Sequence, residues 1–185
     1  MVKQGYHHGN LRQALVESAI KLIEARGPTG FSLSEAAKQA GVTPAAVYRH
    51  FEGRDDLIAE VALEGYKIFA DLMQFAYDKG QPSALAAFEA TGRAYLAFAR
   101  RYPGYYISMF ESGISVNRTP ELAAASSKAR GILEQAAEDL GKHIPKDKRP
   151  PASMFSAHIL AMSQDRKSTR LNSSHSSVSR MPSSA

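Results

Sequence analysis

The sequence predicts an all-α fold, and three observations carry the prediction. Ala, Leu, Glu, Lys and Arg, which favour helices, dominate the composition. Apolar residues recur three or four positions apart, in segments that end at Gly or Pro. No segment alternates apolar and polar residues over a useful length, as a half-buried strand would. We therefore expect helices joined by short turns.

The first two helices are marked by capping signals. Asn10 is placed as the N-cap of the first helix. This helix ends at Arg26-Gly27-Pro28, because Gly suits the left-handed position after a helix and Pro cannot continue it. Ser32 and Glu35 have the spacing of a capping box and open a short second helix, which Gly41 closes. The first helix carries an apolar stripe of Leu11, Leu15, Ala19, Leu22 and Ile23.

The third helix is expected over residues 44–50. Thr43 occupies the N-cap position, and Pro44 follows at the first helical position, where its missing N–H costs nothing. Val42 and Val47 lie where a hydrophobic staple forms, so this helix is expected to be fixed to the core at its start.

A long fourth helix is expected from Arg54 to Lys79, with Asp55 and Asp56 in its first turn, where negative charge is favourable. Its predicted apolar side consists of Leu57, Val61, Ile68, Leu72 and Phe75. Further amphipathic segments follow Gly80-Gln81-Pro82 and cover residues 83–101, 104–112, 120–142 and 151–164. Thr119 is expected to cap the third of these segments.

Composition and charge exclude several classes of protein. The chain has no Cys, which excludes disulfides, thiolate metal sites and thiol catalysis. No window approaches the ~20 apolar residues of a membrane span. The N-terminus lacks the apolar stretch of a signal peptide, so a cytoplasmic protein of bacterial type is expected. The net charge of +5 does not by itself indicate a nucleic-acid partner, because the basic residues between Arg166 and Arg180 supply most of it.

The end of the chain differs in kind from the rest. Residues 166–185 are rich in Ser, contain no acid and show no helical periodicity. Such a composition buries too little apolar surface to offset its ordering entropy. It also resembles translated vector or sequencing-adapter sequence more than a natural terminus. We therefore expect native regions at 1–53 and 54–164, a disordered tail at 165–185, and a native chain that continued past Gln164.

The pattern that predicts function lies in residues 31–61. Two short helices joined by a tight turn at Gly41 are typical of a helix-turn-helix. The second helix would enter the major groove of DNA by its N-terminal end. Small residues there allow close approach, and the polar residues after them suit phosphates or base edges. These candidates are Thr43, Pro44, Ala45, Ala46, Tyr48, Arg49 and His50.

The same region resembles a known family. The stretch from about Tyr6 to Tyr66 is similar to the N-terminal domain of tetracycline-repressor-like (TetR/AcrR) regulators. Four groups of residues carry the resemblance: Tyr6-His7-His8-Gly9-Asn10-Leu11-Arg12, Ala40-Gly41-Val42-Thr43, Tyr48-Arg49-His50-Phe51 and Arg54-Asp55-Asp56-Leu57.

The resemblance implies roles for single residues and for partners. Thr43, Tyr48 and His50 would contact phosphate, Ala45 would pack near thymine methyl groups, and Arg54 would reach the DNA backbone. Ser34 completes this candidate set. The implied partners are a double-stranded DNA operator, a second copy of the chain bound through the C-terminal helices, and a small-molecule effector of unknown identity.

An aromatic and methionine cluster in the second half has two interpretations. Such clusters are more often core than pocket. The resemblance implies instead an effector cavity between helices, in which Tyr hydroxyls would orient an apolar ligand. A satisfied core histidine is the commoner role for the single His among these residues. The candidate pocket residues are Phe69, Met73, Tyr95, Phe98, Tyr102, Tyr106, Met109, Phe110 and His158.

The sequence therefore predicts a sequence-specific DNA-binding transcription regulator. The resemblance implies further that it is a ligand-responsive repressor that acts as a homodimer on a palindromic operator. No catalytic signature stands in a strand-turn-helix context, so no enzyme activity is expected. No cofactor, metal ion or membrane partner is expected either. Two alternatives stay open: an enzyme with an appended helix-turn-helix, and a dimeric regulator or architectural protein whose C-terminal half binds no effector.

Overall fold

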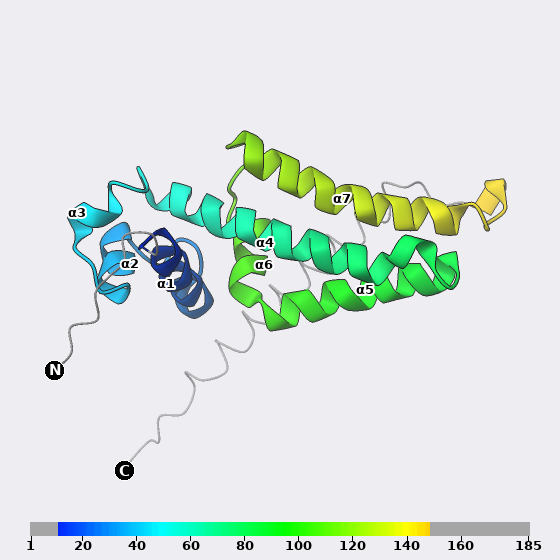
Figure 1. Cartoon of the computed structure of the whole chain (residues 1–185), viewed down its shortest axis with the longest axis horizontal. Coiled ribbons are helices and arrows are strands. Elements are labelled where there is room, and N and C mark those ends of the chain that lie inside the picture. Colours follow the sequence, from blue (N-terminus) through cyan, green and yellow to red (C-terminus); the bar gives the residue numbers. More distant parts are fainter. Residues whose placement is uncertain (1–10, 149–185) are drawn as a thin grey trace, which may run out of the picture. The chain divides into compact units, whose positions relative to one another are not determined.

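A computed structural model describes residues 11–148, and these residues form helices and turns without a strand (Figure 1). The predicted all-α class is confirmed. The α-helices are α1 (Leu11–Arg26), α2 (Leu33–Gln39), α3 (Pro44–Val47), α4 (Arg54–Tyr77), α5 (Ala84–Arg101), α6 (Pro103–Phe110) and α7 (Pro120–Gly141). Short 3-10 turns follow at η2 (Asp78–Gly80) and η3 (Lys146–Lys148).

Local sequence signals fix the ends of the first helices as predicted. Gly27 takes a φ of +79° directly after α1, and Gly41 takes +73° in the turn after α2. The capping box is present in both directions: Ser32 Oγ accepts the Glu35 N–H, and Glu35 Oε2 accepts the Ser32 N–H. The expected Asn10 cap and the expected helix at 151–164 lie outside the described residues.

Helices α3 and α4 end earlier than the sequence pattern predicts, as does α6, which ends at Phe110 rather than at residue 112. Regular α-helix in α3 stops at Val47 rather than residue 50, because the Val47 carbonyl accepts both the His50 and the Phe51 N–H and closes a turn. Helix α4 stops at Tyr77 rather than Lys79. Asp78 and Lys79 take left-handed φ values of 39° and 53°, which no α-helix contains.

The predicted apolar side of α4 is also partly wrong. Phe75 is 84% exposed, and Ile68 and Leu72 are only half-buried. The face that packs against other helices runs instead from Leu57 and Val61 through Gly65 to Phe69 and Met73. Apolar residues occupy two adjacent faces of this helix, and spacing alone does not decide which of them meets the core.

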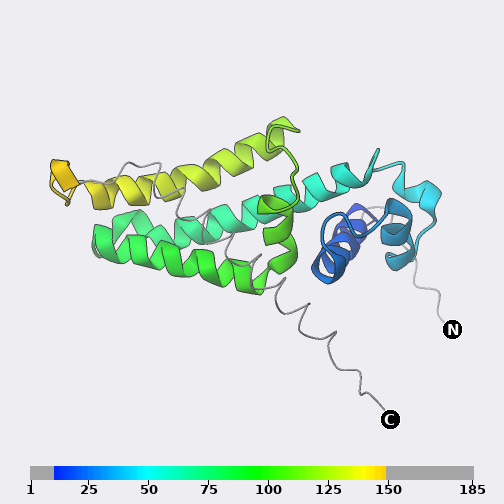
Figure 2. The ribbon, with the colours of Figure 1, turned by 180° about the vertical axis from the view of Figure 1, so that it is seen from behind.

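One hydrophobic core unites α1, α2, α3 and the N-terminal half of α4 (Figures 1 and 2). It also includes Ile107 of α6, which is 6% exposed, with Tyr105 and Ile114 packed against its edge. The core is therefore built by the helix-turn-helix together with α4 and α6. Its buried side chains include Leu15, Val16, Ile23, Leu33, Ala36, Ala37, Val47, Phe51, Leu57 and Val61.

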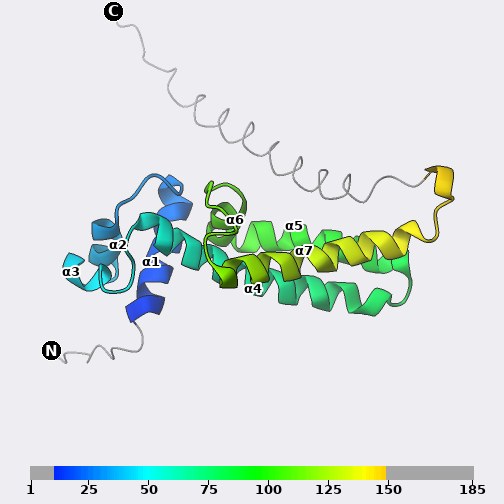
Figure 3. The ribbon, with the colours of Figure 1, turned by 90° about the horizontal axis from the view of Figure 1, so that it is seen from above.

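Helix α6 approaches its two neighbours closely because glycines face them. A Cβ built on Gly65 of α4 would lie 2.7 Å from the Met109 sulfur. A Cβ on Gly104 would lie 2.7 Å from Ile20 Cγ2, on α1. The Gly104 N–H also donates to Glu24 Oε1 at 3.1 Å. Helix α6 is thus held between α1 and α4, as the view from above shows (Figure 3).

The chain divides into two compact units, residues 1–136 and 137–185. In the first, α5 packs along α4, and Lys128 of α7 forms an ion pair with Asp71 of α4 at 3.1 Å. In the second, residues 137–148 complete α7 and form η3, and Lys142 pairs with Asp139 at 2.6 Å. Among residues 11–148, no helix is both long and apolar enough to cross a membrane.

Gly104→Ala should destabilise the protein by about 1–3 kcal/mol, the usual cost of an added methyl in a packed contact. The matched control is Gly131→Ala, because Gly131 is an exposed glycine of α7 with nothing within 4 Å of a built Cβ. That change should stabilise by about 0.4–1 kcal/mol, since Ala restricts the unfolded chain. Urea unfolding followed by circular dichroism measures both. Equal effects of the two substitutions would contradict the close α1–α6 approach.

Candidate nucleic-acid interface

Helices α2 and α3 are packed together on either side of a tight turn. Ala36, Ala37 and Val47 have no exposed surface, so α2 and α3 meet through small side chains. The Val42 N–H donates to the Ala37 carbonyl at 2.9 Å and fixes the chain after Gly41. The predicted geometry of two short helices joined at Gly41 is therefore present.

The recognition segment, residues 43–50, separates core from surface residue by residue. Val47 is fully buried and Ala46 packs half-buried against the core. Every other candidate in the segment is exposed: Thr43, Pro44, Ala45, Tyr48, Arg49 and His50. Tyr48 is 58% exposed, which is high for an aromatic side chain. Ser34, in the first turn of α2, is exposed as well.

Thr43 stands at the predicted N-cap position but makes no side-chain capping bond. Its carbonyl accepts the Ala46 N–H at 3.0 Å. The expected capping by the Thr43 side chain is therefore wrong, and the exposed hydroxyl is not engaged at the helix end.

Arg54 lies against its own protein. Nη1 donates to the Thr29 carbonyl at 3.4 Å, and Nε and Nη2 approach Asp55 Oδ1 at 3.4 and 3.3 Å. These contacts are long and the side chain is 37% exposed, so little holds the guanidinium in this position.

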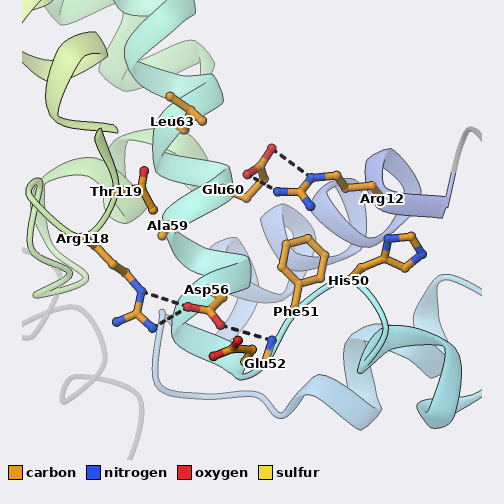
Figure 4. A pocket seen from close by; sticks show the side chains of 10 residues that line it. All are labelled: Arg12, His50, Phe51, Glu52, Asp56, Ala59, Glu60, Leu63, Arg118 and Thr119. Carbon is orange, nitrogen blue, oxygen red and sulfur yellow. Dashed lines mark hydrogen bonds and ion pairs between the residues drawn. The ribbon is translucent and has the colours of Figure 1, made fainter. Parts of the chain in front are cut away.

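A cavity of about 340 Å³ lies beside the recognition segment (Figure 4). Phe51 and His50 line it together with parts of α1, α4 and the chain before α7. Arg12 pairs with Glu60 at 2.6 Å, and its guanidinium lies 5.0 Å from the centre of the Phe51 ring. Arg118 pairs with Asp56 on the other side. The sequence contains no local signal for either pair, because 48 and 62 positions separate the partners.

The candidate effector residues come together in the second half of the first unit. Phe69 is the hub: its ring centre lies 5.4 Å from Tyr95, 5.0 Å from Phe98 and 6.1 Å from Phe110. Tyr102 and Phe110 are half-buried, and His158 lies outside the described residues. The remaining members are buried: Phe69, Met73, Tyr95, Phe98, Tyr106 and Met109.

Two tyrosines outside the predicted set of pocket residues border this cluster. Tyr66 contacts Phe110 edge to face and donates to the Met109 carbonyl at 3.4 Å. Burial raises the pKa of Tyr66. Tyr105 donates to Glu64 Oε2 at 3.1 Å, and burial next to this carboxylate raises the pKa of Tyr105 to about 12. Both hydroxyls are thus neutral donors at physiological pH.

Within the described residues, no group of three or more His, Cys, Asp or Glu side chains is arranged to hold a metal ion. The polar groups that the first unit offers to a partner are those around the recognition segment. Two short helices joined by a tight turn, the second with an exposed N-terminal end and exposed polar residues after it, are the arrangement of a helix-turn-helix.

Comparison with known proteins supports the helix-turn-helix class. Residues 15–61 match the family model of bacterial regulatory proteins of the tetR family, and residues 88–163 match a tetracyclin repressor-like C-terminal domain. The chain is 29% identical over 99 residues to YobS of Bacillus subtilis, an uncharacterised HTH-type transcriptional regulator. That match covers 53% of this chain and 50% of YobS, so it spans about half the length of this relative.

Solved structures share the fold. A protein of unknown function from Rhodococcus sp. RHA1 superposes with a TM-score of 0.71 at 24% identity, over 92% of this chain and 89% of that one. AibR, solved in complex with isovaleryl coenzyme A and operator DNA, superposes with a TM-score of 0.64 at 20% identity, over 81% of this chain and 84% of that one.

The chain belongs to the tetracycline-repressor (TetR) family of bacterial transcription regulators. Members of this family are DNA-binding regulators rather than enzymes, and the sequence-based prediction of a DNA-binding regulator is confirmed at that level.

The capping box makes α2 sensitive to acid. Hydrogen bonds from Arg26, then from Ser32, lower the pKa of Glu35. A lowered folded-state pKa stabilises the protein above the unfolded pKa of about 4.3 and loses this effect as pH falls through the folded value. Glu35→Gln keeps a residue that serves in capping boxes but removes the charge. Wild type should melt above the variant at neutral pH, and the difference in Tm should shrink as the pH falls below the unfolded pKa of about 4.3. If the difference in Tm between wild type and Glu35→Gln stayed constant from neutral to acid pH, the charge of Glu35 would not be what stabilises α2.

Proposed function

We propose that the chain is a sequence-specific repressor that binds a palindromic operator as a homodimer and releases it when a small molecule binds. The observation that carries the DNA-binding part is the recognition segment, in which Val47 faces the core while Thr43, Ala45 and Arg49 are exposed. A reading helix needs this division, because its rigidity must come from one face and its contacts from the other.

Specific reading is assigned to the start of α3. The exposed Ala45 is small enough for the backbone to approach base edges and thymine methyl groups. Thr43, Tyr48 and His50 suit phosphates, which position the protein without reading sequence. Arg54 joins them by leaving the Thr29 carbonyl, and its long contacts make this exchange inexpensive.

Effector binding is assigned to the aromatic cluster around Phe69. Its tyrosines offer hydroxyls in an apolar surrounding, which suits a largely apolar ligand with one or two polar groups. The fold neighbour AibR, solved with a ligand and operator DNA together, supports pairing the two functions on this fold. The predicted boundary between residues 53 and 54 would then place most of the DNA-contacting residues before α4 and the effector candidates after it, with α4 belonging to both parts.

A dimeric regulator without an effector is the second candidate. The dense contacts of Phe69 with three other rings favour it, because close-packed rings leave little space between them. A thermal-shift screen of small apolar carboxylic acids and their thioesters separates the two candidates. A ligand that raises Tm and also weakens DNA binding supports the repressor; ligands that do neither favour the second candidate.

Selection of bound sequences from random DNA duplexes tests the proposal. A dimer should enrich two inverted half-sites whose centres lie one helical turn apart, about 34–36 Å, or a multiple of this spacing. Enrichment of a single half-site would contradict the dimer. A pool that shows no enrichment would contradict sequence-specific binding.

Ala45→Glu should abolish binding to the selected duplex, because the carboxylate would enter a groove walled by phosphates. The fold should persist, since Ala45 is exposed and Glu is favourable in the first turn of a helix. Ala124→Glu, an identical change at an exposed position of α7, is the control and should bind normally. Fluorescence anisotropy and circular dichroism measure both. Retained binding by Ala45→Glu would show that α3 is not the reading helix.

A further inference from the structure

The α6–α7 segment, residues 111–119, lies against the helix-turn-helix. Ile114 packs half-buried on its core. Side-chain hydroxyls order the segment: Ser112 Oγ accepts the Ile114 N–H at 3.1 Å, and Ser115 Oγ accepts the Asn117 N–H at 3.2 Å. Thr119 Oγ1 accepts the Leu122 N–H at 3.1 Å and caps α7, as predicted. The segment is therefore a structured connection rather than a loose loop.

Arg118 joins this segment to the beginning of α4. Its Nε donates to Asp56 Oδ1 at 3.0 Å, and its Nη2 donates to the same oxygen. The other carboxylate oxygen, Asp56 Oδ2, accepts the Glu52 N–H at 3.1 Å. Figure 4 shows the three groups in line, with Asp56 between Arg118 and the backbone of Glu52. One carboxylate thus links residues from three parts of the chain.

The position of Glu52 gives this link its importance. Residues 51–53 connect the recognition segment to α4, and Phe51 anchors one end of the connection in the core. At the other end, Gly53 is the N-cap of α4 and makes no side-chain capping bond, since Gly has no side chain. Asp56, the third residue of α4, instead accepts the Glu52 N–H and so ties the first turn of the helix to the residue that precedes its N-cap. Arg118 in turn lowers the pKa of Asp56 and holds its side chain in place.

We propose that Arg118 is a positioning residue for DNA binding: acting through Asp56, it fixes the connection between the recognition segment and α4 and couples the α6–α7 segment to the DNA-reading surface. This inference rests on the proposed function and names its regulatory contact. A displacement of α6 or α7 moves Arg118 away from Asp56. The Asp56 side chain then holds the Glu52 N–H less firmly, and residues 51–53, which follow the recognition segment, become more mobile.

Two simpler roles of Arg118 predict a different effect of its substitution on DNA binding. A plain surface ion pair contributes little to stability and nothing specific to DNA binding. A direct phosphate contact by Arg118 would add a cation to the interface, and its loss would reduce the salt dependence of binding by about 0.9 in the slope of log K against log salt. A positioning residue weakens binding without changing that slope.

The test compares Arg118→Gln, Asp56→Asn and the double variant on a fluorescein-labelled duplex from the selection. Each single variant should bind about three- to fivefold more weakly, the size expected for one exposed ion pair. The double variant should bind no more weakly than either single variant, because both changes break the same link. The salt slope should stay at the wild-type value. If Asp56→Asn acted only by removing a negative charge, DNA affinity would rise rather than fall, because losing an acid favours binding to phosphates.

Arg130→Gln is the matched control. Arg130 is an exposed arginine of α7 paired at 3.6 Å with Glu134 of the same helix, so the substitution removes the same charge without breaking a link to Asp56. Its affinity should equal that of wild type. Equal weakening by Arg130→Gln, a smaller salt slope for Arg118→Gln, or additive single effects would each overturn the proposal.

Amide hydrogen exchange supplies a readout that does not need DNA. The Glu52 amide should exchange several-fold faster in Arg118→Gln, whereas amides of α1 in the core should exchange as in wild type. Unchanged exchange at Glu52 would overturn the positioning role even if affinity fell. If wild type enriched no duplex while Glu52 responded as expected, the proposed function would fail and the mechanical link would stand.

Discussion

The structure depends on one helix being shared by two cores. The N-terminal half of α4 buries Leu57 and Val61 against the helix-turn-helix, and its C-terminal half buries Phe69 and Met73 among the aromatic residues of α5 and α6. Protein interiors are close-packed and resist continuous deformation. A shift of α4 therefore disturbs both cores, and the two halves of the first unit do not behave as independent bodies. A regulator that converts ligand binding into DNA release needs such a shared element.

The small residues on α4 and α6 strengthen this constraint. Gly65 allows Met109 to lie against the α4 backbone, and Gly104 allows α6 to touch α1. Helix α6 consequently contributes Ile107 to the same core that supports the recognition segment. The carboxylate of Glu24 adds a polar contact at the start of α6, where the helix dipole favours negative charge. Helices α1, α4 and α6 thus meet at the core that supports the recognition segment.

Features encoded by neighbouring residues were predictable from the sequence. The Ser32–Glu35 capping box, the left-handed Gly27 and Gly41, and the Thr119 cap all depend on contacts within a few positions. Of the recognition-segment candidates named from the motif, all but the half-buried Ala46 are exposed. The burial of α4 was less predictable, because Phe75 and Met73 are equally apolar and only the packing of α5 and α6 distinguishes them. The Arg118–Asp56 link has no sequence signature at all, since it forms only when distant segments are folded together.

The brevity of α3 bears on how this protein diversifies. Four residues form its regular helix, too few to be stable alone, so its conformation is imposed by Val47, Phe51 and the Gly41 turn. The outward residues contribute little to that support. The exposed Ala45 and Arg49 can therefore be replaced at small cost in folding stability, whereas Val47 and Phe51 are constrained by packing. Replaceable and constrained positions thus alternate along the seven residues from Ala45 to Phe51, so the exposed surface of this segment can change while the scaffold beneath it is kept.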